Sequence, residues 1–489
     1  MTEQELLHYA PHLPRVAGLE SEYGIYAPTM PSVSDFQLSD PNLKIIIDNM
    51  HNLHGGSVIP NILGYSAFGR VYEDVGRHIE HATNEYIDYA SLAYAKTGAD
   101  LRLVDAVQCY LQQLERTDGH SPATYALLPI RSSDGFGNFW GGVHINLAMP
   151  RSGFNRILGN EAKSGITQNG LPIELVSFAS FLVCSAITMG KGALRADDGK
   201  FNVCPPERLQ ATYKLVGGGT TSSRPLVNSR DEPHADKNVH ARLHIISQDV
   251  HTRPLTTALQ LSVLSAMLRT IEIGKPLEYN LDLGELGFIR TIARLASMHH
   301  MDEQTVYSPK GTASMTIFEL FARNIEQLRI LAHTEGFPAQ EVSALEIAYD
   351  AINLYLNGDI NNTKVRVLMP WVYRKLAIDR SGLTGRPLKS EEVEELKAID
   401  RTFDSYLIKP DKIVVGAELQ RVRTPKVVEI ANKEILTPPT NTRADIRAKF
   451  IASIPEHAKN PRISWSQGYY DEEDRRITWA CSDPRGLSN

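Results

Sequence analysis

The chain has 489 residues, of which 42% are hydrophobic and 22% charged, a composition that excludes a disordered protein and allows more than one domain. Its 51 Lys and Arg residues against 57 Asp and Glu residues give a formal net charge of −6. This argues against nucleic-acid binding as the main role, because no basic excess is present to neutralise phosphates. The four cysteines are widely separated and form no CxxC pair, so we expect neither a zinc-finger site nor a disulfide framework, as in a reducing compartment.

The apolar segments predict a cytoplasmic protein that does not span a membrane. The N-terminal segment lacks a basic region followed by an apolar run, and so does not resemble a secretory signal. The longest apolar stretch, Leu175–Met189, is short for a membrane span and contains Ser and Thr. We therefore expect it to form a buried core helix.

The first predicted strand, within Pro14–Pro28, carries two acids. Glu20 and Glu22 are two residues apart, which places both carboxylates on one face of a strand. Neighbouring carboxylates repel each other unless a cation lies beside them. The pair therefore indicates either a metal site or a solvated face.

The next predicted strand, Gly64–Asp74, is the most polar segment of this region. Arg70, Tyr72 and Asp74 occupy alternate positions, so a strand places all three on one face. A guanidinium, a phenol and a carboxylate do not make a hydrophobic core face. Gly76 is then expected to end the strand.

The chain after Gly76 brings Glu80 and Thr83 back toward the same region. Together with Arg70, Tyr72 and Asp74 they offer two carboxylates, a cation, a phenol and a hydroxyl. This set can hold magnesium and a polyphosphate, since Mg²⁺ usually shares one or two carboxylates with substrate phosphates. An edge strand with a solvated polar face is an equal alternative.

A long helix is predicted over Asn84–Thr117, with a break near Gly98. Two strands follow, Tyr125–Ile130 and Phe139–Met149, and His144 lies on the second. A histidine on such a strand is either a ligand or a core residue with its hydrogen bonds satisfied, and the sequence alone favours the core residue.

The segment Gly217–Ser247 is the second region dense in chemically active groups. Arg230 is followed by an acidic run, and Arg242 and His244 alternate along a predicted strand. The segment predicts an arginine-lined site for an anion, because guanidinium groups bind phosphate or carboxylate through paired hydrogen bonds. The alternative is a surface loop with local ion pairs of little energetic value.

The remaining segments are expected to form scaffold and a C-terminal domain. Amphipathic spacing predicts helices over Asn42–His54, Val250–Glu272, Ser314–His333, Ala339–Leu356, Asn361–Arg380 and Ser390–Phe403. A Lys-, Val- and Pro-rich shift over Pro410–Pro439 predicts a boundary, which divides the chain into domains 1–415 and 416–489. The second contains a predicted helix, Asn441–Ile454, and predicted strands around Ile463–Tyr470 and Arg475–Cys481.

These pieces are compatible with ATP-dependent activation of a carboxylate. Neither a GxxxxGK[ST] loop nor a strand–GxGxxG–helix unit occurs, so a nucleotide would have to be held by an acidic sheet and Mg²⁺. Transfer of phosphate to a carboxylate then allows attack by an amine, which a carboxylate such as Asp74 deprotonates. Metal and arginines neutralise the charge on the transferred group.

The chain resembles the Pup ligases and their sister enzymes, the Pup deamidase/depupylases, nearly from end to end. The resemblance rests on five motifs: GLESEYG at 18–24, GRVYEDVGRHIEHATNE at 69–85, TTSSRPLVNSRDEPHAD at 220–236 with RLHII at 242–246, PPTNTRADIRAKF at 438–450 and ISWSQGYYDEEDRRITWACSDP at 463–484. It implies an α+β fold: a large glutamine-synthetase-like domain with a curved, mainly antiparallel sheet backed by helices, and a small C-terminal α/β domain.

The resemblance also implies roles for individual residues. Glu20, Tyr72 and Glu80 stand where the family binds Mg²⁺, and Asp74 stands at its proton-accepting aspartate. The implied ATP contacts are Arg70, Thr83 and Trp465, and we add Arg230 and His244 of the arginine-rich segment to the expected cofactor-binding group. The implied partners are a Pup-like modifier, joined through the side-chain carboxylate of its C-terminal glutamate, and lysine-bearing target proteins sent to a proteasome.

Three functions remain to be separated. The ligase branch is favoured, because about 45 residues separate Glu22 from Phe68 and the depupylases carry a long insertion there. The family's usual His-Glu-Asn-Tyr run reads His144-Ile145-Asn146-Leu147 here, and its Lys-Asn-Asn run reads Leu128–Arg131. These departures concern the substrate side of the site and leave open a divergent ligase for a different small modifier, or a family member that only binds or hydrolyses ATP. A depupylase on the same fold is the further alternative.

Overall fold

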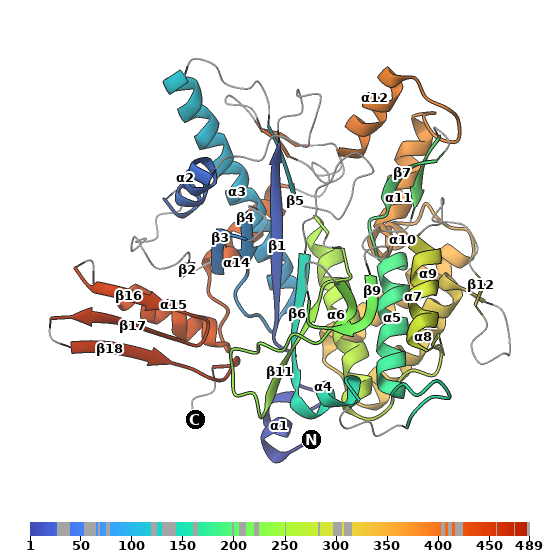
Figure 1. The fold of residues 1–489 in the computed structure, drawn as a ribbon, viewed down its shortest axis with the longest axis horizontal. Coiled ribbons are helices and arrows are strands. Elements are labelled where there is room, and N and C mark those ends of the chain that lie inside the picture. Colours follow the sequence, from blue (N-terminus) through green and yellow to red (C-terminus); the bar gives the residue numbers. More distant parts are fainter. Residues whose placement is uncertain are drawn as a thin grey trace.

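A sheet of eleven strands runs through the middle of the computed structural model (Figure 1). The structure describes residues 1–26, 40–52, 65–66, 69–74, 79–118, 125–129, 143–159, 165–197, 200–204, 212–219, 224–249, 251–281, 284–296, 306–307, 315–401, 406–408, 413–415, 424–455, 457–473 and 475–486. Within these residues the main path of the sheet has the order β15-β14-β5-β1-β6-β11-β10-β9, and β2, β3 and β4 join it beside β1. The strands are β1 (Ala17–Tyr26), β2 (Tyr65–Ser66), β3 (Gly69–Glu73), β4 (Ile79–Ala82), β5 (Tyr125–Pro129), β6 (Val143–Pro150), β9 (Thr212–Gly217), β10 (Arg224–Asn228), β11 (His240–Ile245), β14 (Tyr406–Ile408) and β15 (Ile413–Val415).

Strand β1 lies at the centre of this sheet and pairs with β4, β5 and β6. All described pairs of the sheet are antiparallel except β9 with β10, which confirms the predicted mainly antiparallel sheet. Alternation along β6 decides which side chains face the core, since Val143 and Ile145 are buried and His144 and Asn146 are not. The two polar side chains are thereby directed to the face opposite the core.

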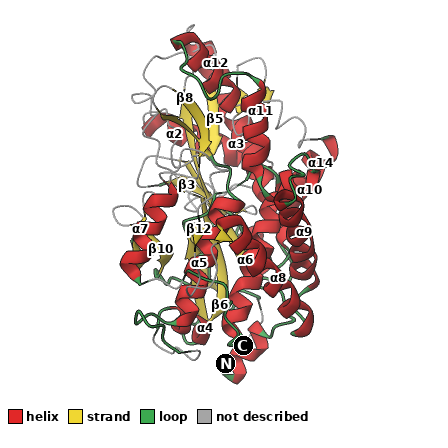
Figure 2. Cartoon of the chain, turned by 90° about the vertical axis from the view of Figure 1, so that its right-hand side faces the viewer, coloured by secondary structure: helices red, strands yellow, loops and turns green. Residues whose placement is uncertain are grey.

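Helices of the main body pack beside the strands of the sheet (Figure 2). Those of the main body are α4 (Arg151–Ile157), α5 (Ile173–Thr188), α6 (Pro254–Glu272), α7 (Glu285–Ala296), α8 (Ile317–Thr334), α9 (Ala339–Leu356), α10 (Thr363–Leu368), α11 (Pro370–Arg380) and α12 (Ser390–Arg401). The main hydrophobic core lies between them and the sheet. Every described residue of α5 from Glu174 onward is buried, which confirms the predicted core helix. Among the described residues, no helix has the length and apolarity needed to cross a bilayer.

Two short hairpins and the N-terminal helix complete the main body. The hairpins are β7 (Ala193–Asp197) with β8 (Lys200–Cys204), and β12 (Val306–Tyr307) with β13 (Met315–Thr316). Helix α1 (Glu3–Tyr9) begins with a capping box, in which the Thr2 hydroxyl accepts the Glu5 N–H and the Glu5 carboxylate accepts the Thr2 N–H.

The predicted break at Gly98 is wrong, because α3 (Tyr89–Asp118) continues through it. Helices α2 (Asp40–Asn52) and α14 (Pro425–Leu436) lie against α3 around a second, smaller core. A Cβ at Gly98 would lie 2.5 Å from the carbonyl oxygen of Ala431 and 2.9 Å from Ile435. The glycine therefore allows α14 to approach α3 closely, and it does not interrupt the helix.

The C-terminal unit contains α15 (Arg443–Ser453) and a separate sheet of β16 (Lys459–Ile463), β17 (Gln467–Glu472) and β18 (Arg475–Ala480). The predicted strand around Ile463–Tyr470 corresponds to β17, which begins only at Gln467 because the Ser464 N–H bonds the Gln467 carbonyl at 2.7 Å and closes a turn there. Trp465 lies in this turn. The proposed boundary at 415/416 borders residues outside the described part and stays a prediction.

Candidate active site

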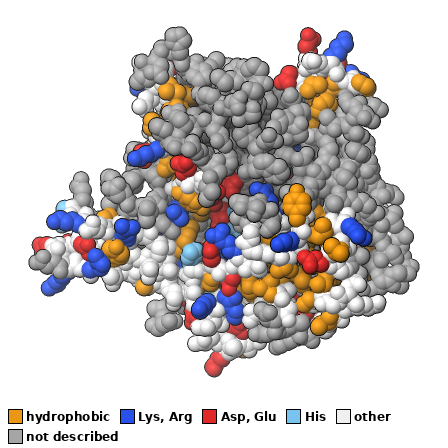
Figure 3. Space-filling view, in the orientation of Figure 1, with side chains coloured by type: hydrophobic (Ala, Val, Ile, Leu, Met, Phe, Trp, Pro, Cys, Tyr) orange, Lys and Arg blue, Asp and Glu red, His pale blue; other side chains and the backbone are white. Residues whose placement is uncertain are grey.

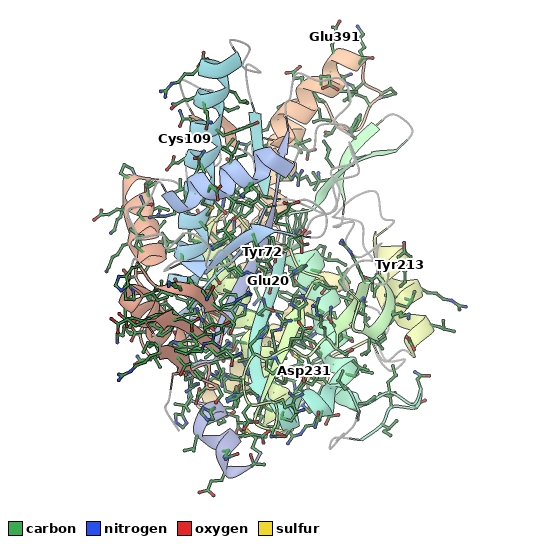
Figure 4. All side chains as sticks on the ribbon, turned by 60° about the vertical axis from the view of Figure 1, so that its left-hand side comes forward. Glu20, Tyr72, Cys109, Tyr213, Asp231 and Glu391 are labelled. Atoms are coloured by element: carbon green, nitrogen blue, oxygen red, sulfur yellow. The ribbon has the colours of Figure 1, made fainter. Side chains whose placement is uncertain are left out.

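The predicted acidic residues meet on one face of β1, β3 and β4. In the antiparallel register Glu22 is opposite Glu80 on β4, and Glu80 is in turn opposite Tyr72 on β3. Carboxylate oxygens of Glu22, Asp74 and Glu80 lie within 4.8 Å of one another. Figure 4 shows Glu20 and Tyr72 close together in the middle of the molecule. The alternation read from the sequence therefore does bring these side chains together.

The crowding of carboxylates changes the titration of Glu80. Burial is the main cause that raises its pKa to about 9, and the charges of Glu20, Asp74 and Glu22 act in the same direction. Burial and the charge of Glu80 raise the pKa of the Tyr72 phenol far above its usual value, so the phenol keeps its proton and donates a hydrogen bond to the Glu80 carboxyl group. Without a bound cation, burial and mutual repulsion make the negatively charged form of these carboxylates energetically unfavourable.

A second cluster surrounds Glu20, formed by neighbours on β6 and β11. Glu20 Oε2 lies 3.0 Å from His144 Nδ1, and Glu20 Oε1 accepts a hydrogen bond from Asn146 Nδ2 at 3.0 Å. Arg242 Nη1 lies 3.4 Å from the same Oε1. His244 Nδ1 bonds Asn146 Oδ1 at 2.8 Å, and its ring lies 4.7 Å from that of His144. Although burial opposes ionisation, the bond to His144 and the charges around Glu20 lower its pKa to about 2.

These contacts fix the tautomers of both histidines. Asn146 donates its amide to Glu20, so its oxygen faces His244 and can only accept. His244 Nδ1 must therefore carry a proton, and the same reasoning applies to His144 Nδ1 beside the Glu20 carboxylate. Burial lowers the pKa of His244 to about 3, so its ring is neutral with the lone pair on Nε2. Glu20, His144 and His244 can thus offer a cation one oxygen and two nitrogen ligands.

An open hollow lies beside these clusters. Its volume is about 640 Å³, including the part that is continuous with solvent. Glu20 and Thr83 line its floor, Arg242 lines one side, and Arg443 and Trp465 line the wall supplied by the C-terminal unit. Acidic, basic and histidine side chains gather near the middle of the face shown in Figure 3. A pocket with a mainly apolar lining and a few placed polar groups is the usual form of a small-molecule site.

Ion pairs to Glu85 hold the C-terminal wall in place. Arg443 Nε lies 2.6 Å from Glu85 Oε1, and Arg447 Nη2 lies 2.7 Å from Glu85 Oε2. The Arg447 guanidinium also lies 4.9 Å from the centre of the Trp465 ring and donates to the Trp465 carbonyl at 2.9 Å. The indole is therefore held over the hollow by a chain of contacts that begins directly after β4.

Of three residues predicted to contact ATP, Thr83 lines the hollow, whereas Arg70 and Arg230 do not. The Arg70 guanidinium lies 4.2 Å from the centre of the Tyr72 ring, on the acidic face beside the hollow. Thr83 lines the hollow, but its hydroxyl accepts the Leu19 N–H at 2.9 Å and donates to the Asn84 carbonyl. Arg230 is about half exposed and pairs with Glu232 at 3.0 Å. The direct ATP contacts assigned to these three residues stay predictions.

The donor sets fit a divalent cation of the Mg²⁺ type. Glu22 and Glu80 provide hard oxygen ligands of the kind that Mg²⁺ prefers, and the Asp74 carboxylate lies beside them. The raised pKa of Glu80 is the observation that supports this fit, because a cation would offset both the burial and the carboxylate repulsion that raise it. Glu20, with the two imidazoles, forms an adjacent set along the same strand.

Sequence reasoning missed the role of Asn146 and the ion pairs of Glu85. His144 is hydrogen-bonded to Glu20, so the choice between a ligand and a histidine with satisfied hydrogen bonds stays open, and the alternation of His144 with Asn146 on β6 was the available signal. The pairing of Glu85 with Arg443 and Arg447 joins segments more than 350 residues apart. No local pattern could have indicated it.

Three comparisons place these features beside known proteins. The family described as "Pup-ligase protein" matches residues 15–468. The Pup--protein ligase of Jonesia denitrificans is 26% identical over 96% of this chain and 95% of its own length, and that of Geodermatophilus obscurus is 26% identical over 85% of each. Two solved structures share the fold at 20% identity. One, of the ligase PafA in complex with Pup, covers 97% of this chain and 90% of its own with a TM-score of 0.74, and the other, of PafA in complex with ADP, covers 94% of each with a TM-score of 0.65.

Proposed function

Because the chain belongs to the Pup-ligase family, we propose that it is an ATP-dependent carboxylate–amine ligase. The enzyme joins the side-chain carboxylate of the C-terminal glutamate of a Pup-like modifier to a lysine of a target protein. The attachment marks that target for proteasomal degradation. The relatives described as Pup--protein ligases, matched over nearly their full length, support the ligase over the depupylase.

The observation that carries the proposal is the convergence of Glu20, Glu22, Tyr72, Asp74 and Glu80 on one sheet face beside a hollow. This arrangement gives each residue type a role that its chemistry allows. Asp74, at the end of β3, is placed to accept a proton from an attacking lysine amine. Its side chain is neither fully buried nor fully exposed, so substrate can reach it.

Nucleotide and metal are held by different parts of the face. Mg²⁺ is assigned to Glu20, Tyr72 and Glu80, with Glu22 opposite Glu80 as a further oxygen ligand. The ion supplies positive charge for the phosphates of ATP. Thr83 and Trp465 line the hollow that takes the nucleotide, and Arg242 offers a guanidinium at its edge. The PafA structure in complex with ADP supports nucleotide binding by this fold.

The reaction is assigned to the cytoplasm. Cys109, Cys184 and Cys481 are free thiols in the described part of the chain, which fits a reducing compartment.

A conjugation assay tests the proposal. Purified protein with Mg-ATP, a Pup-like protein ending in glutamate and a lysine-bearing target is expected to yield an isopeptide conjugate and ADP. Asp74→Asn is expected to reduce the conjugation rate by about 10²- to 10⁴-fold, because it removes the base. Glu73→Gln is the matched control, since Glu73 is exposed and its side chain points to the opposite face of β3.

Three outcomes would contradict the proposal. Conjugation at the wild-type rate by Asp74→Asn would show that another group accepts the proton. Cleavage of a preformed conjugate without net ATP consumption, in the absence of conjugation, would favour the depupylase. ATP turnover unchanged by Glu80→Ala would remove this site from the chemistry altogether.

A further inference from the structure

Three residues from distant parts of the chain form a cluster beneath the hollow. His8 lies in the last turn of α1, His240 begins β11, and Asp483 follows β18 near the C-terminus. One nitrogen of each histidine and one carboxylate oxygen of Asp483 lie within 4.8 Å of one another. The two imidazole rings meet edge to face, with centres 4.9 Å apart.

The polar atoms of this cluster are buried but incompletely bonded. His8 Nδ1 is buried and makes no hydrogen bond, although Asp483 Oδ2 lies 3.4 Å away as its ion-pair partner. The side chains of His8 and Asp483 are only 13% and 8% exposed. A buried nitrogen without a hydrogen bond needs an explanation, and a bound ion is one such explanation.

The surrounding contacts orient the donors toward the shared space. The Tyr9 hydroxyl lies 2.8 Å from His240 Nδ1, which leaves Nε2 of that ring to bind a ligand. Asp483 Oδ1 accepts the Arg485 N–H at 2.7 Å, which leaves Oδ2 directed at His8. Metal-bound histidines and carboxylates are usually held by such outer hydrogen bonds.

We propose that His8, His240 and Asp483 bind a Zn²⁺-type ion that fastens the two ends of the chain to the sheet. Two imidazoles and one carboxylate are a ligand set of zinc, with water in the fourth position. Zinc–ligand bonds of about 2.0–2.1 Å place tetrahedral ligand atoms roughly 3.4 Å apart, so closure requires side-chain shifts of about 1 Å. The nitrogen donors distinguish this site from the all-carboxylate cluster of Glu22, Asp74 and Glu80, which suits Mg²⁺.

A bound ion in this cluster would affect the wall of the hollow, because the cluster lies next to that wall. His8 and Asp483 lie outside residues 15–468, so the site belongs to the ends of this chain. His240 and Pro484 line the hollow, and the Arg443 N–H bonds the Pro484 carbonyl at 3.1 Å. A bound ion therefore fixes one edge of the wall on which Arg443 lies.

Metal binding by the untagged full-length protein tests this inference. Chelator-treated protein is titrated with Zn²⁺ and, separately, with Co²⁺ in millimolar Mg²⁺, which occupies the oxygen sites. One Zn²⁺ per chain, visible d–d absorption of the Co²⁺ form and a rise in Tm of a few degrees with Zn²⁺ in large excess over its Kd are expected. His8→Ala and Asp483→Ala should each weaken Zn²⁺ binding by more than the roughly 10- to 100-fold typical of losing an outer hydrogen-bond partner, and should remove that rise.

His12→Ala is the matched control, because His12 is exposed and only four residues beyond His8. It should bind Zn²⁺ as the wild type does, and circular dichroism of all variants checks that they fold. Equal Zn²⁺ and Co²⁺ binding by wild type and both cluster variants would overturn the proposal and place the ion at His144 and His244. If no Zn²⁺ binds and both variants have a lower Tm, the cluster is a stabilising ion pair and the metal-site proposal is wrong.

Discussion

At the scale of single residues, Asn146 links the Glu20 carboxylate to the His244 imidazole. Its amide nitrogen holds Glu20 and its oxygen sets the proton of His244. Neither contact was predicted, because an asparagine in a strand is unremarkable until its cross-strand neighbours are known. The register of β1, β6 and β11 places Glu20 opposite His144 and Asn146 opposite His244.

Replacing Asn146 by alanine should therefore impair the site without touching substrate chemistry directly. Loss of a residue that orients ligands typically costs about 10- to 100-fold in metal affinity or activity. We expect Asn146→Ala to raise the Mg²⁺ concentration needed for half-maximal ATP turnover by such a factor. Asn357→Ala, at an exposed position beyond α9, is the control, and an unchanged Mg²⁺ requirement in Asn146→Ala would show that Glu20 needs no support.

Glu85 shows how one buried residue makes the C-terminal unit depend on pH. The charges of Arg447 and Arg443 outweigh the effect of burial and lower its pKa to about 2. Because the folded-state pKa lies below the ordinary value of 4.5, the ion pairs contribute their full stability above about pH 4.5. That contribution is lost as the pH falls toward 2.

Glu85→Gln should therefore destabilise the protein at pH 7 by about 3 kcal/mol, from roughly 1.4 kcal/mol per unit of pKa shift. The difference from wild type should shrink as the pH is lowered from 4.5 to 3, which urea unfolding at several pH values can measure. Glu429→Gln removes an exposed carboxylate on α14 and serves as the control. A pH-independent difference would mean that the carboxylate charge is not what holds Arg443 and Arg447.

At the scale of helices and strands, hydrophobic periodicity predicted most elements but not which of them pack closely against each other. The spacing of apolar residues located α9 at its observed bounds, Ala339–Leu356, and α6 within a few residues, because burial along these helices is regular. Gly98 misled the prediction since a glycine in a helix is ambiguous: it marks either a break or a contact with another helix. Only the position of α14 decides between the two.

Gly98→Ala should consequently destabilise the protein, although alanine is the better helix former. The added methyl would lie 2.5 Å from the Ala431 carbonyl oxygen, and overpacking of this kind typically costs about 1–3 kcal/mol. Thermal unfolding measures the effect. Combining the change with Ile435→Ala should recover only part of the loss, because the backbone carbonyl remains, and a higher Tm for Gly98→Ala alone would contradict the packing argument.

At the scale of the whole molecule, the sequence predicted the sheet face that carries Glu20, Tyr72, Asp74 and Glu80 because alternation in a strand is a local property. It did not predict which distant segments close the site. The wall with Arg443 and Trp465 and the cluster of His8 with Asp483 depend on contacts between the two ends of the chain and the centre. Such contacts follow from the tertiary fold, which no window of sequence contains.

The attachment of both acidic clusters to β1 has a consequence for how this enzyme can diversify. One cluster includes Glu20 and the other Glu22, and a strand advances about 3.3 Å per residue, so their separation is a fixed step of roughly 7 Å. Insertions or deletions in the connecting loops leave that step unaltered. Changes in the connecting loops can thus accommodate new target proteins, while the separation between Glu20 and Glu22 stays the same.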